Sequence, residues 1–510
     1  MSIVYLIGAG PGDPGLMTVR GLQCLMSADV VLYDHLVPAR LLRHARASAE
    51  KIDVGTAAPQ PLEQEAICYL LAEKAREGKT VARLKWGDPF VFDRGGAEAL
   101  FLHEQGVRFE VVPGIPVGLA VPAYAGVPVT YPGAGDTLTF VRGHEDAGKT
   151  RASIDWTSLA RLDGTIVCYA GPDQLPQMLH ALLTHGRAPD EPAAVVYDGT
   201  LPTQQTLAGT LGDVERRVRQ SGDRRPAVLV VGRVAALREH LRWFDARPLF
   251  GRRVLVTRQR DQAQELVDHL EAAGAEAIVA PMIQIAPPDD LAPLDDACAH
   301  VAEFDWIVFA SPNAVEAFLD RLLVGARDLR ALGTVKICVV GQATAERLAT
   351  YGLKADLVPA EYRAEAVVPA LSGVAPIAGL TVLLPRADIG REVVADDLRK
   401  HGAVVTDVVA YRTLTAEPRE TDPDIYRMLL DRQIDVVTFA SPSAVRSFVR
   451  LLGDEPAADL LRTTVVACLG PVTSEAATQC QIDTHVMPTT YTIPALVKAI
   501  VEHFSHVTNP

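Results

Sequence analysis

The amino-acid sequence predicts an α/β protein, with parallel sheets that helices cover on both faces in its second half. Short apolar runs such as residues 337–340 are bounded by Gly or Ser-Pro turns and are followed by helical patterns such as residues 343–348. A length of 510 residues, with 48% hydrophobic residues, supplies apolar material for about three or four cores of roughly 150 residues each. Sheets of this kind bind ligands at the carboxyl ends of their strands, so the strand-to-helix turns are the candidate sites.

The first apolar run, residues 3–7, leads into a loop of glycine and proline at residues 8–15. The loop looks like a dinucleotide-binding motif, but Asp13 replaces the third glycine, and Pro11 and Pro14 interrupt the helix start that would hold a pyrophosphate. A rigid turn that ends in a carboxylate suits a neutral or cationic ligand better than a phosphate. The loop therefore favours S-adenosylmethionine (SAM) over NAD.

Charge and cysteine patterns exclude several classes of protein. The formal net charge of −14 offers no basic excess for binding nucleic acid. No apolar run reaches about 20 residues, and no basic leader precedes the first run, so neither a membrane segment nor a signal peptide is predicted. The seven cysteines form no C-x-x-C pair and no zinc-type cluster with histidine. We therefore expect a cytoplasmic protein with reduced core cysteines and no metal.

A domain boundary is predicted near residues 245–251. A helical stretch at residues 235–241 ends just before it, and a new strand begins at residue 253. A flexible tether would be longer and richer in Gly or Ser. The chain is therefore expected to consist of a first half, residues 1–245, and a second half, residues 251–510.

The second half repeats itself. Residues 305–318, with the sequence DWIVFASPNAVEAF, match residues 435–448, with the sequence DVVTFASPSAVRSF. Two more pairs of segments match in the same order: 341–344 with 470–473, and 253–258 with 381–386. Three matches separated by about 130 residues each indicate a duplicated α/β unit.

Four hydroxyl residues lie at equivalent turns of the two copies: Ser311, Ser441, Thr344 and Thr473. Each serine precedes a proline at a first helical turn, so it is either an N-cap or a ligand-binding group. Each threonine follows a glycine at a helix start, and for these we favour a binding role. Hydroxyl and N–H groups from two opposed helix starts would form a clamp for several carboxylates.

The second half resembles uroporphyrinogen-III synthase from residue 251 to about residue 505. The resemblance rests on the paired F-A-S-P-x-A-V motifs, the paired G-x-x-T turns and the sequence V-V-A-Y-R-T at residues 408–413. It implies two duplicated parallel-sheet lobes, lobe one at about 251–285 plus 415–510 and lobe two at about 287–411. It also implies that hydroxymethylbilane is cyclised to uroporphyrinogen III with inversion of the last ring.

Tyr411 lies beside the crossover between the lobes that this resemblance implies. It is the candidate general acid, because a phenol is protonated at neutral pH and can donate to a leaving hydroxyl. The other interpretation is a tyrosine packed at the junction of the lobes. Arg258, Arg386 and Arg412 are candidate partners for the carboxylates of the substrate.

The first half resembles uroporphyrinogen-III C-methyltransferase of the tetrapyrrole methylase family over residues 1–244. The resemblance rests on the loop at 8–15 and on motifs that follow in order at 33–37, 83–92, 112–115, 122–128, 199–204 and 226–227. It implies two α/β subdomains with SAM between them, a homodimer formed through this half, and SAM contacts at Pro11, Gly87, Asp88, Ala170, Gly199 and Ala227. Asp34, in the sequence Y-D-H-L-V, would position the substrate or accept a proton; otherwise it caps the next turn.

The first half departs from the family motifs at Trp86, Pro116, Tyr131 and Ala170. Two functional hypotheses follow. One is a bifunctional enzyme that makes precorrin-2 from hydroxymethylbilane, by way of uroporphyrinogen III, for sirohaem or cobalamin synthesis. The alternative is a monofunctional synthase whose first half is not catalytic. A third hypothesis, a pair of sensory lobes without chemistry, explains the duplication but not Tyr411 at the crossover.

Overall fold

The computed structural model describes residues 2–34, 36–38, 40–55, 62–143, 154–359, 364–388, 393–416, 423–452 and 457–507. His35, within the motif at residues 33–37, lies outside them. The chain forms two compact units: the first consists of Met1–Arg253, Asp268–Ala277 and Val501–Pro510, and the second of Val254–Val267 and Ile278–Ile500. The main division at Arg253 lies close to the boundary predicted near 245–251, although two short segments of the second half group with the first unit.

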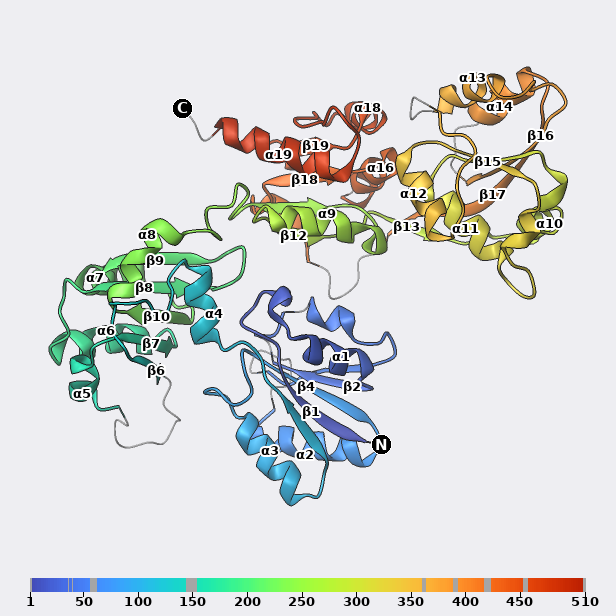
Figure 1. The fold of residues 1–510 in the computed structure, drawn as a ribbon. Helices are drawn as coiled ribbons and strands as arrows, with labels where there is room; N and C mark the ends of the chain where they lie inside the picture. The colour runs from blue at the N-terminus through green and yellow to red at the C-terminus, as the bar shows by residue number, and fades with distance from the viewer. Residues whose placement is uncertain are drawn as a thin grey trace. The chain divides into compact units, whose positions relative to one another are not determined.

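The first sheet (blue in Figure 1) has the order β3-β2-β4-β1-β5, and its paired strands run parallel. In β1, Val4 and Leu6 pack in the core formed with α2 and α3, whereas Ile7 packs in the core formed with α1. Helices therefore cover both faces, and the turns that follow β1, β2, β4 and β5 lie at one edge. The elements are β1 (Ile3–Gly8), α1 (Val19–Ser27), β2 (Val30–Tyr33), β3 (Glu50–Asp53), α2 (Gln64–Arg76), β4 (Thr80–Lys85), α3 (Gly95–Glu104) and β5 (Phe109–Val112).

The second sheet follows helix α4 (Val117–Tyr124) and has the order β6-β7-β10-β8-β9. Its strands β6 and β7 are parallel, and the remaining pairs are antiparallel. The first unit thus contains two different α/β subdomains, as the sequence predicts. The elements are β6 (Leu138–Arg142), α5 (Trp156–Arg161), β7 (Thr165–Ala170), α6 (Gln174–Thr184), β8 (Pro192–Tyr197), β9 (Gln205–Thr210), α7 (Leu211–Ser221), β10 (Ala227–Val231) and α8 (Arg238–Leu241).

The second half contains two further sheets, one in each lobe. The sheet of lobe one has the order β12-β11-β18-β19 and that of lobe two β13-β17-β16-β14-β15. Lobe one contains β11 (Arg253–Val256), α9 (Arg260–Ala272), β12 (Glu276–Val279), α15 (Ile425–Leu430), β18 (Val436–Phe439), α16 (Pro442–Leu451), α17 (Ala457–Leu460), β19 (Val465–Cys468), α18 (Pro471–Gln479) and α19 (Ile493–Val507). Lobe two contains β13 (Ile283–Ala286), α10 (Ala292–Ala299), β14 (Trp306–Phe309), α11 (Pro312–Leu322), β15 (Lys336–Val339), α12 (Gln342–Thr350), α13 (Val367–Ser372), β16 (Thr381–Ala387), α14 (Val393–Lys400) and β17 (Val404–Thr415).

The connection between the lobes is an antiparallel strand pair. Strand β13 pairs with Arg412–Thr415 at the end of β17, with Ile283 opposite Thr415. The sequence predicts residues 283–285 in lobe one, whereas the structure places β13 in the sheet of lobe two. The reason is that its backbone N–H and C=O groups find their partners on β17. In the described residues, the chain therefore enters lobe two through β13 and leaves it through the end of β17, next to Tyr411.

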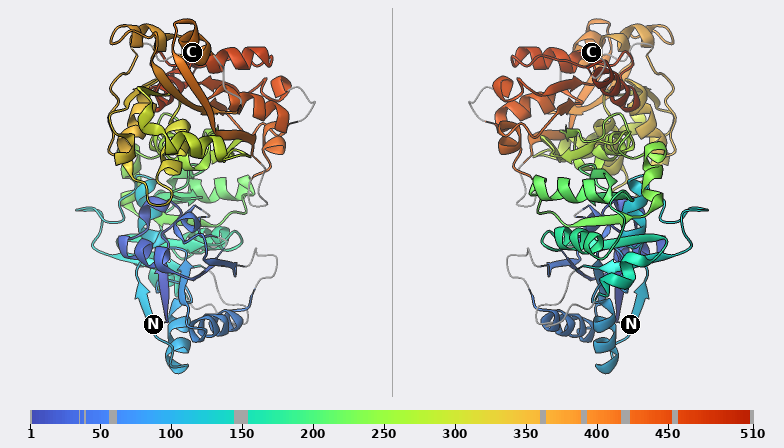
Figure 2. Two further views of the ribbon diagram at one scale, coloured as in Figure 1. Left: turned by 90° about the vertical axis from the view of Figure 1, so that its right-hand side faces the viewer. Right: turned by 90° about the vertical axis from the view of Figure 1, so that its left-hand side faces the viewer.

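The repeated motif forms the same strand and helix in both lobes, β14 with α11 and β18 with α16, which confirms the predicted duplication. In lobe two, Ile307 and Phe309 of β14 pack toward α10 and α11, whereas Trp306 and Val308 pack toward α13 and α14. Helices cover both faces of this sheet (Figures 1 and 2). This alternation explains the nearly continuous apolar sequence of its strands.

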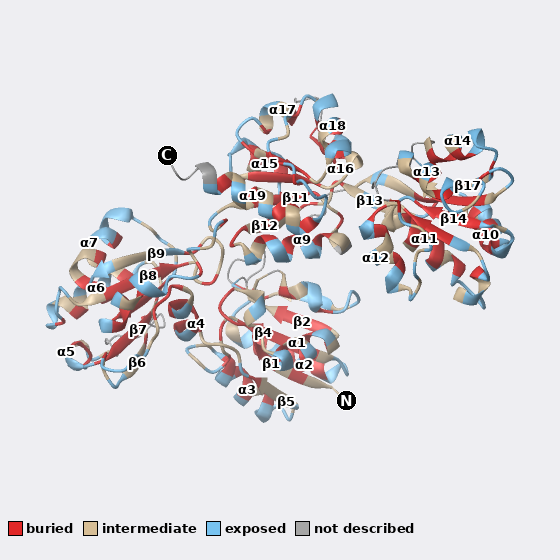
Figure 3. Cartoon of the chain, turned by 45° about the horizontal axis from the view of Figure 1, so that its top comes forward, coloured by how far each residue is buried: buried red, intermediate tan, exposed pale blue. Residues whose placement is uncertain are grey.

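Buried residues concentrate on the central strands of the sheets, and exposed residues lie on the outer sides of the helices (Figure 3). All seven cysteines are free thiols, and six of them are buried. The prediction that the cysteines lie in the core is therefore confirmed for six of them, whereas Cys480 is partly exposed.

Gly8 should tolerate no side chain. A Cβ atom there would lie 2.4 Å from Gly114 Cα and 2.7 Å from Gly87 O, both backbone atoms of adjoining turns. We expect Gly8→Ala to lower the melting temperature through about 1–3 kcal/mol of overpacking. Gly96 in α3 has nothing within 4 Å of the equivalent position, so Gly96→Ala should be neutral or stabilising by up to about 1 kcal/mol. Equal melting temperatures for the two variants would contradict this packing.

Candidate active sites

The glycine-proline loop after β1 is hydrogen-bonded to the turn after β4. Gly87 N–H donates to Gly10 O at 2.8 Å, and Gly87 has a φ of +71°, which favours glycine. The indole N–H of Trp86 donates to the carbonyl oxygen of Pro11 at 2.7 Å. Trp86, a departure from the family motif, therefore fixes the position of a predicted SAM contact.

The tip of the same loop is bonded to the second subdomain. Asp13 N–H donates to Thr200 Oγ1 at 3.0 Å, and the Asp13 carboxylate accepts from the Tyr124 hydroxyl at 2.7 Å and from Gly15 N–H at 2.8 Å. Burial and the bond to Asp13 raise the pKa of Tyr124 above its ordinary value. The carboxylate that the sequence associates with a ligand thus organises the loop.

The other predicted SAM contacts lie in tight turns and at strand ends. The Asp88 carboxylate accepts from Phe90 N–H at 2.8 Å and from Gly114 N–H at 3.0 Å. A Cβ atom on Gly199 would lie 2.4 Å from a methyl carbon of Val121. Ala170 and Ala227, both buried, are register partners on β7 and β10. Their contact with SAM stays a prediction.

Asp34 belongs to a network of buried charges. Its carboxylate accepts from the guanidinium of Arg83 at 2.8 Å, and Arg83 in turn lies 3.4 Å from Glu98. The ammonium of Lys85 lies 2.9 Å from Glu98 and 3.1 Å from Asp93. Arg83, Lys85 and Glu98 are each at most 1% exposed, whereas Asp34 has 25% of its side chain exposed. Arg83 thus holds Asp34 in one orientation while leaving it accessible.

The electrostatics of the network follow from its geometry. Burial opposes ionisation of Glu98, but Arg83 and Lys85 outweigh it and lower the pKa of that carboxyl. The pKa of Arg83 is raised because Glu98 and Asp34 outweigh its burial. Burial raises the pKa of Asp93, even though Lys85 favours its ionised form. Glu98 is therefore the anion that makes two buried cations tolerable.

In lobe two, Tyr411 is 7% exposed, and its hydroxyl lies 3.0 Å from Ser311 Oγ. Burial raises the pKa of Tyr411, while hydrogen bonds from Ser311 and Asn313 act in the opposite direction. Ser311 also accepts from Ala314 N–H at 3.1 Å and caps helix α11. The N-cap interpretation of Ser311 is thus confirmed, and the structure adds a direct bond to Tyr411.

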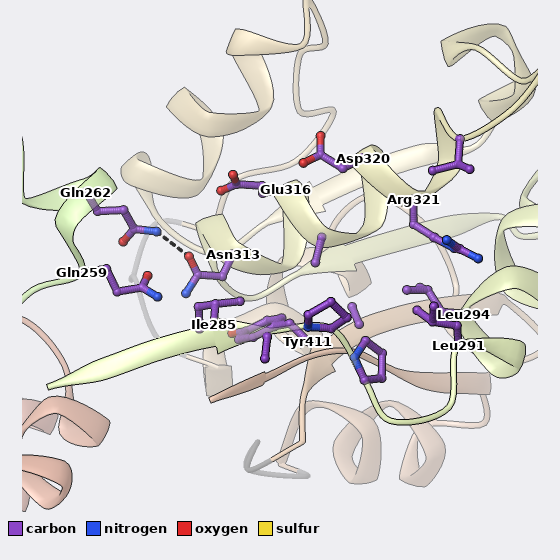
Figure 4. Close-up of a pocket in the computed structure, with 16 residues that line it drawn as sticks. Gln259, Gln262, Ile285, Leu291, Leu294, Asn313, Glu316, Asp320, Arg321 and Tyr411 are labelled. Atoms are coloured by element: carbon purple, nitrogen blue, oxygen red, sulfur yellow. Dashed lines mark hydrogen bonds between the residues drawn. The ribbon is translucent and has the colours of Figure 1, made fainter. Parts of the chain in front are cut away.

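A cavity of about 410 Å³ opens beside Tyr411, a volume typical of a small-molecule site. Gln262 Nε2 donates to Asn313 Oδ1 at 2.5 Å across one end of the cavity (Figure 4). This bond joins helix α9 of lobe one to helix α11 of lobe two. The lining residues are Gln259, Gln262, Ile285, Ala286, Pro287, Pro288, Leu291, Leu294, Asn313, Glu316, Ala317, Asp320, Arg321, Val324, Ala410 and Tyr411.

None of the four predicted hydroxyl residues lines this cavity, and Ser311 is connected to it through its hydrogen bond to Tyr411. Ser441 accepts from Ala444 N–H at 3.3 Å and caps α16, as the N-cap interpretation predicts. Thr344 and Thr473 are 2% and 4% exposed, and the Thr344 hydroxyl donates to Val340 O of the preceding strand end at 3.0 Å. The predicted threonine clamp stays a prediction, because the described contacts do not bring the two hydroxyls together.

The three predicted arginines have different surroundings, and none lines the cavity. Arg386 donates to the Asp407 carboxylate at 3.0 Å. Arg412 donates to Pro287 O at 2.9 Å and lies 2.7 Å from Asp289. Arg258, two residues after the end of β11, is half-buried. Their role toward substrate carboxylates stays a prediction.

Several residues of these sites are absent from the sequence-based predictions: Lys85, Glu98, Tyr124, Gln262 and Asn313. A signal exists for Lys85, because a charged residue at the end of an apolar strand requires a buried counterion. A signal also exists for Asn313, since the duplicated motif has Ser443 at the equivalent place. Tyr124 and Gln262 owe their importance to contacts with residues more than 50 positions away.

Comparison with known proteins assigns both halves. Residues 3–215 match the family Tetrapyrrole (Corrin/Porphyrin) Methylases, and residues 264–498 match Uroporphyrinogen-III synthase HemD. The porphyrin biosynthesis protein HemD of Ruminiclostridium josui is 36% identical over 502 residues, 98% of this chain and 97% of that protein.

Two further relatives each align with about half of this chain. An S-adenosyl-L-methionine-dependent uroporphyrinogen III methyltransferase of Methanosarcina barkeri is 45% identical over 239 residues, 47% of this chain and 94% of that protein. A siroheme synthase of Thiobacillus denitrificans is 44% identical over 242 residues, 47% of this chain and 50% of that protein.

The chain therefore combines a tetrapyrrole methylase domain with a uroporphyrinogen-III synthase domain. It belongs to the family of HemD porphyrin biosynthesis proteins, in which the two domains are fused. It is a bifunctional enzyme of tetrapyrrole biosynthesis, and the hypothesis of a non-catalytic first half is not favoured.

Among the described residues, no cluster of three or more His, Cys, Asp and Glu side chains is placed to hold a metal ion. No helix in the described ranges combines the length and apolar character needed to cross a bilayer.

Replacing Glu98 by Gln should destabilise the first unit by about 3–5 kcal/mol, because it removes the anion shared by two buried cations. The folded-state pKa of Glu98 lies below its unfolded value, so this stabilisation is complete above the unfolded value of 4.5. It is lost as the pH falls through the lower folded-state value. Calorimetric unfolding of both proteins at pH 7 and on acidification measures the difference, which should shrink in acid.

The matched control is Glu110→Gln, which removes an exposed partner of Arg20. Its melting temperature should stay close to that of the unaltered protein at every pH. If Glu98→Gln behaved like this control, the network would not be a stabilising element.

Proposed function

We propose that the second half converts hydroxymethylbilane to uroporphyrinogen III with Tyr411 as general acid, and that the first half methylates this product to precorrin-2 with SAM. The observation that carries the proposal is the buried Tyr411 phenol at the wall of a cavity that residues from both lobes line. Membership of the fused family supports the two activities, and the name of the Methanosarcina relative supports SAM as the methyl donor.

The synthase step begins with loss of the hydroxyl of the substrate. Tyr411 donates its proton to that oxygen, the C–O bond breaks, and water leaves. The electron-poor carbon that remains is attacked by the substituted carbon of the terminal pyrrole. The resulting spiro intermediate then fragments and recloses with the last ring inverted. The raised pKa of Tyr411 keeps the proton available at neutral pH.

The cavity supplies the surroundings that this step requires. Its walls are largely apolar, with Ile285, Leu291 and Leu294 on one side. Exclusion of water strengthens the hydrogen bond of the acid and protects the electron-poor carbon from attack by solvent. The carboxylates of the substrate would extend past these walls toward the arginines predicted to pair with them.

The residues of the first half fit a donor without phosphate. Asp13 and Asp88 place two carboxylates in the loops around Pro11 and Gly87, which suits a sulfonium cation and would repel a pyrophosphate. Bound SAM would supply an electrophilic methyl group. The hydrogen bonds of Trp86 and Asp13 hold the loop at residues 8–15 in place. Such positioning of the methyl donor provides most of the rate of methyl transfer.

Asp34 would act on the methyl acceptor. Arg83 holds its carboxylate in one orientation, and its exposed part can accept the N–H of a pyrrole or the proton released after methylation. Formation of a homodimer through the first half also belongs to this proposal, as does a role in sirohaem synthesis, which the name of the Thiobacillus relative favours.

Tyr411→Phe should lower kcat for ring closure by about 100-fold or more, because the acid is lost while the ring keeps its packing. The measurement is the rate of uroporphyrinogen III formation from hydroxymethylbilane, separated from the uroporphyrinogen I that forms without enzyme. Near-normal turnover by this variant would remove Tyr411 from the mechanism.

A substitution in one half should abolish the activity of that half and leave the activity of the other half unchanged. With hydroxymethylbilane and SAM, the unaltered chain should give a product with two added methyl groups, and without SAM it should stop at uroporphyrinogen III. Asp34→Asn should close the ring at the normal rate but methylate the product about 100-fold more slowly. Tyr411→Phe should methylate added uroporphyrinogen III normally. Products are separated by isomer and by mass; a chain that adds no methyl group under any condition refutes the methylase part.

A further inference from the structure

The duplicated motif differs between its two copies at three positions that line the cavity of lobe two, and Asn313 is the one nearest the capping serine in sequence. In lobe two the sequence is Ser311-Pro-Asn313, and in lobe one it is Ser441-Pro-Ser443. Both serines cap their helices, with Oγ accepting from the N–H three residues later at 3.1 and 3.3 Å. The helix start therefore needs no asparagine, and another reason must account for Asn313.

Asn313 lies between the other lobe and Tyr411. Its Oδ1 accepts from Gln262 Nε2 of α9 at 2.5 Å, so its Nδ2 carries the hydrogen atoms that remain to be donated. Figure 4 shows this amide nitrogen on the side of the Tyr411 hydroxyl, and the three side chains line one cavity. In lobe one, the equivalent Ser443 bonds to its own cap, Ser441, at 3.0 Å.

We propose that Asn313 is a positioning residue for the acid step, with its amide donating to the Tyr411 oxygen in an orientation that Gln262 fixes. The inference rests on the proposed role of Tyr411 as acid. When Tyr411 gives its O–H proton to the departing hydroxyl, negative charge develops on the phenol oxygen. An N–H donor stabilises that charge more than it stabilises the neutral phenol, so it speeds the step.

The electrostatic surroundings of Tyr411 agree with this role. The bond to Asn313 lowers the pKa of Tyr411, as does the bond to Ser311, whereas burial and the charge of Asp388 raise it. Asn313 and Ser311 thus restrain a shift that would otherwise make the phenol too weak an acid. The bond to Gln262 also makes the orientation of the amide depend on contact between α9 and α11, which belong to different lobes.

A double-mutant cycle in the full chain tests the inference, with Asn313→Ala, Tyr411→Phe, their combination, and Ser443→Ala as the matched control. We expect Asn313→Ala to lower kcat on the order of tenfold, the effect of one lost hydrogen bond. In the pH–rate profile of ring closure, the fall in kcat at alkaline pH should move to higher pH in this variant, because the donor that lowers the pKa of Tyr411 is gone. Ser443→Ala should match the unaltered protein, and the loss of Asn313 should cost nothing further in the Tyr411→Phe background.

Asn313→Asp adds a variant of nearly the same shape that still accepts from Gln262 but donates nothing. It should slow ring closure and shift the alkaline fall of the pH–rate profile upward, with a melting temperature near that of the unaltered protein. The inference would be overturned if the alkaline fall of the pH–rate profile stayed in place in both variants. It would also be overturned if Asn313→Ala lowered kcat by the same factor with Tyr411 and with Phe at position 411. Full activity of Tyr411→Phe would instead refute the proposed acid, so the two failures are distinguishable.

Discussion

Parallel strand pairing is the constraint on which both sites depend. When strands run parallel, every strand-to-helix turn of a subdomain comes to the same edge. In the first sheet this brings together the turns after β1, β4 and β5, so closely that Gly8 and Gly114 leave no space for a Cβ atom beside each other and the Gly87 carbonyl oxygen. In lobe two the same constraint places the Ser311 turn beside the end of β17, where Tyr411 lies.

The first half contains a network of buried charged side chains that must neutralise one another. Two cations in one strand would destabilise the sheet if they stood alone, since desolvation of each costs several kcal/mol. Glu98 compensates both, and Asp34 and Asp93 complete the network at its exposed margin. Asp34 thereby keeps a fixed orientation without losing access to a ligand, which is the arrangement expected of a group that positions a substrate.

The second half shows how a duplicated unit becomes asymmetric. Both copies keep the residues that the fold requires, namely an apolar strand, a capping serine and a proline in the first turn of the helix. The copies differ at Asn313, Glu316 and Ala317 of lobe two, all of which line the cavity. The shared serine and proline are thus explained by folding, whereas the asparagine is explained by the proposed chemistry.

The sequence by itself determined the α/β class, the division near residue 250, the duplication and the families of both halves, because apolar periodicity and motif order are local properties. It also gave helix capping as one of two interpretations of Ser311 and Ser441, and the family resemblance placed Tyr411 beside the crossover. Only the tertiary structure decided that β13 joins lobe two and that Trp86 and Asp13 hold the loop at residues 8–15 in place. The same is true of the neutralisation of the buried Arg83 and Lys85 by Glu98. Those outcomes depend on hydrogen bonds and ion pairs between residues distant in the chain, which no local pattern specifies.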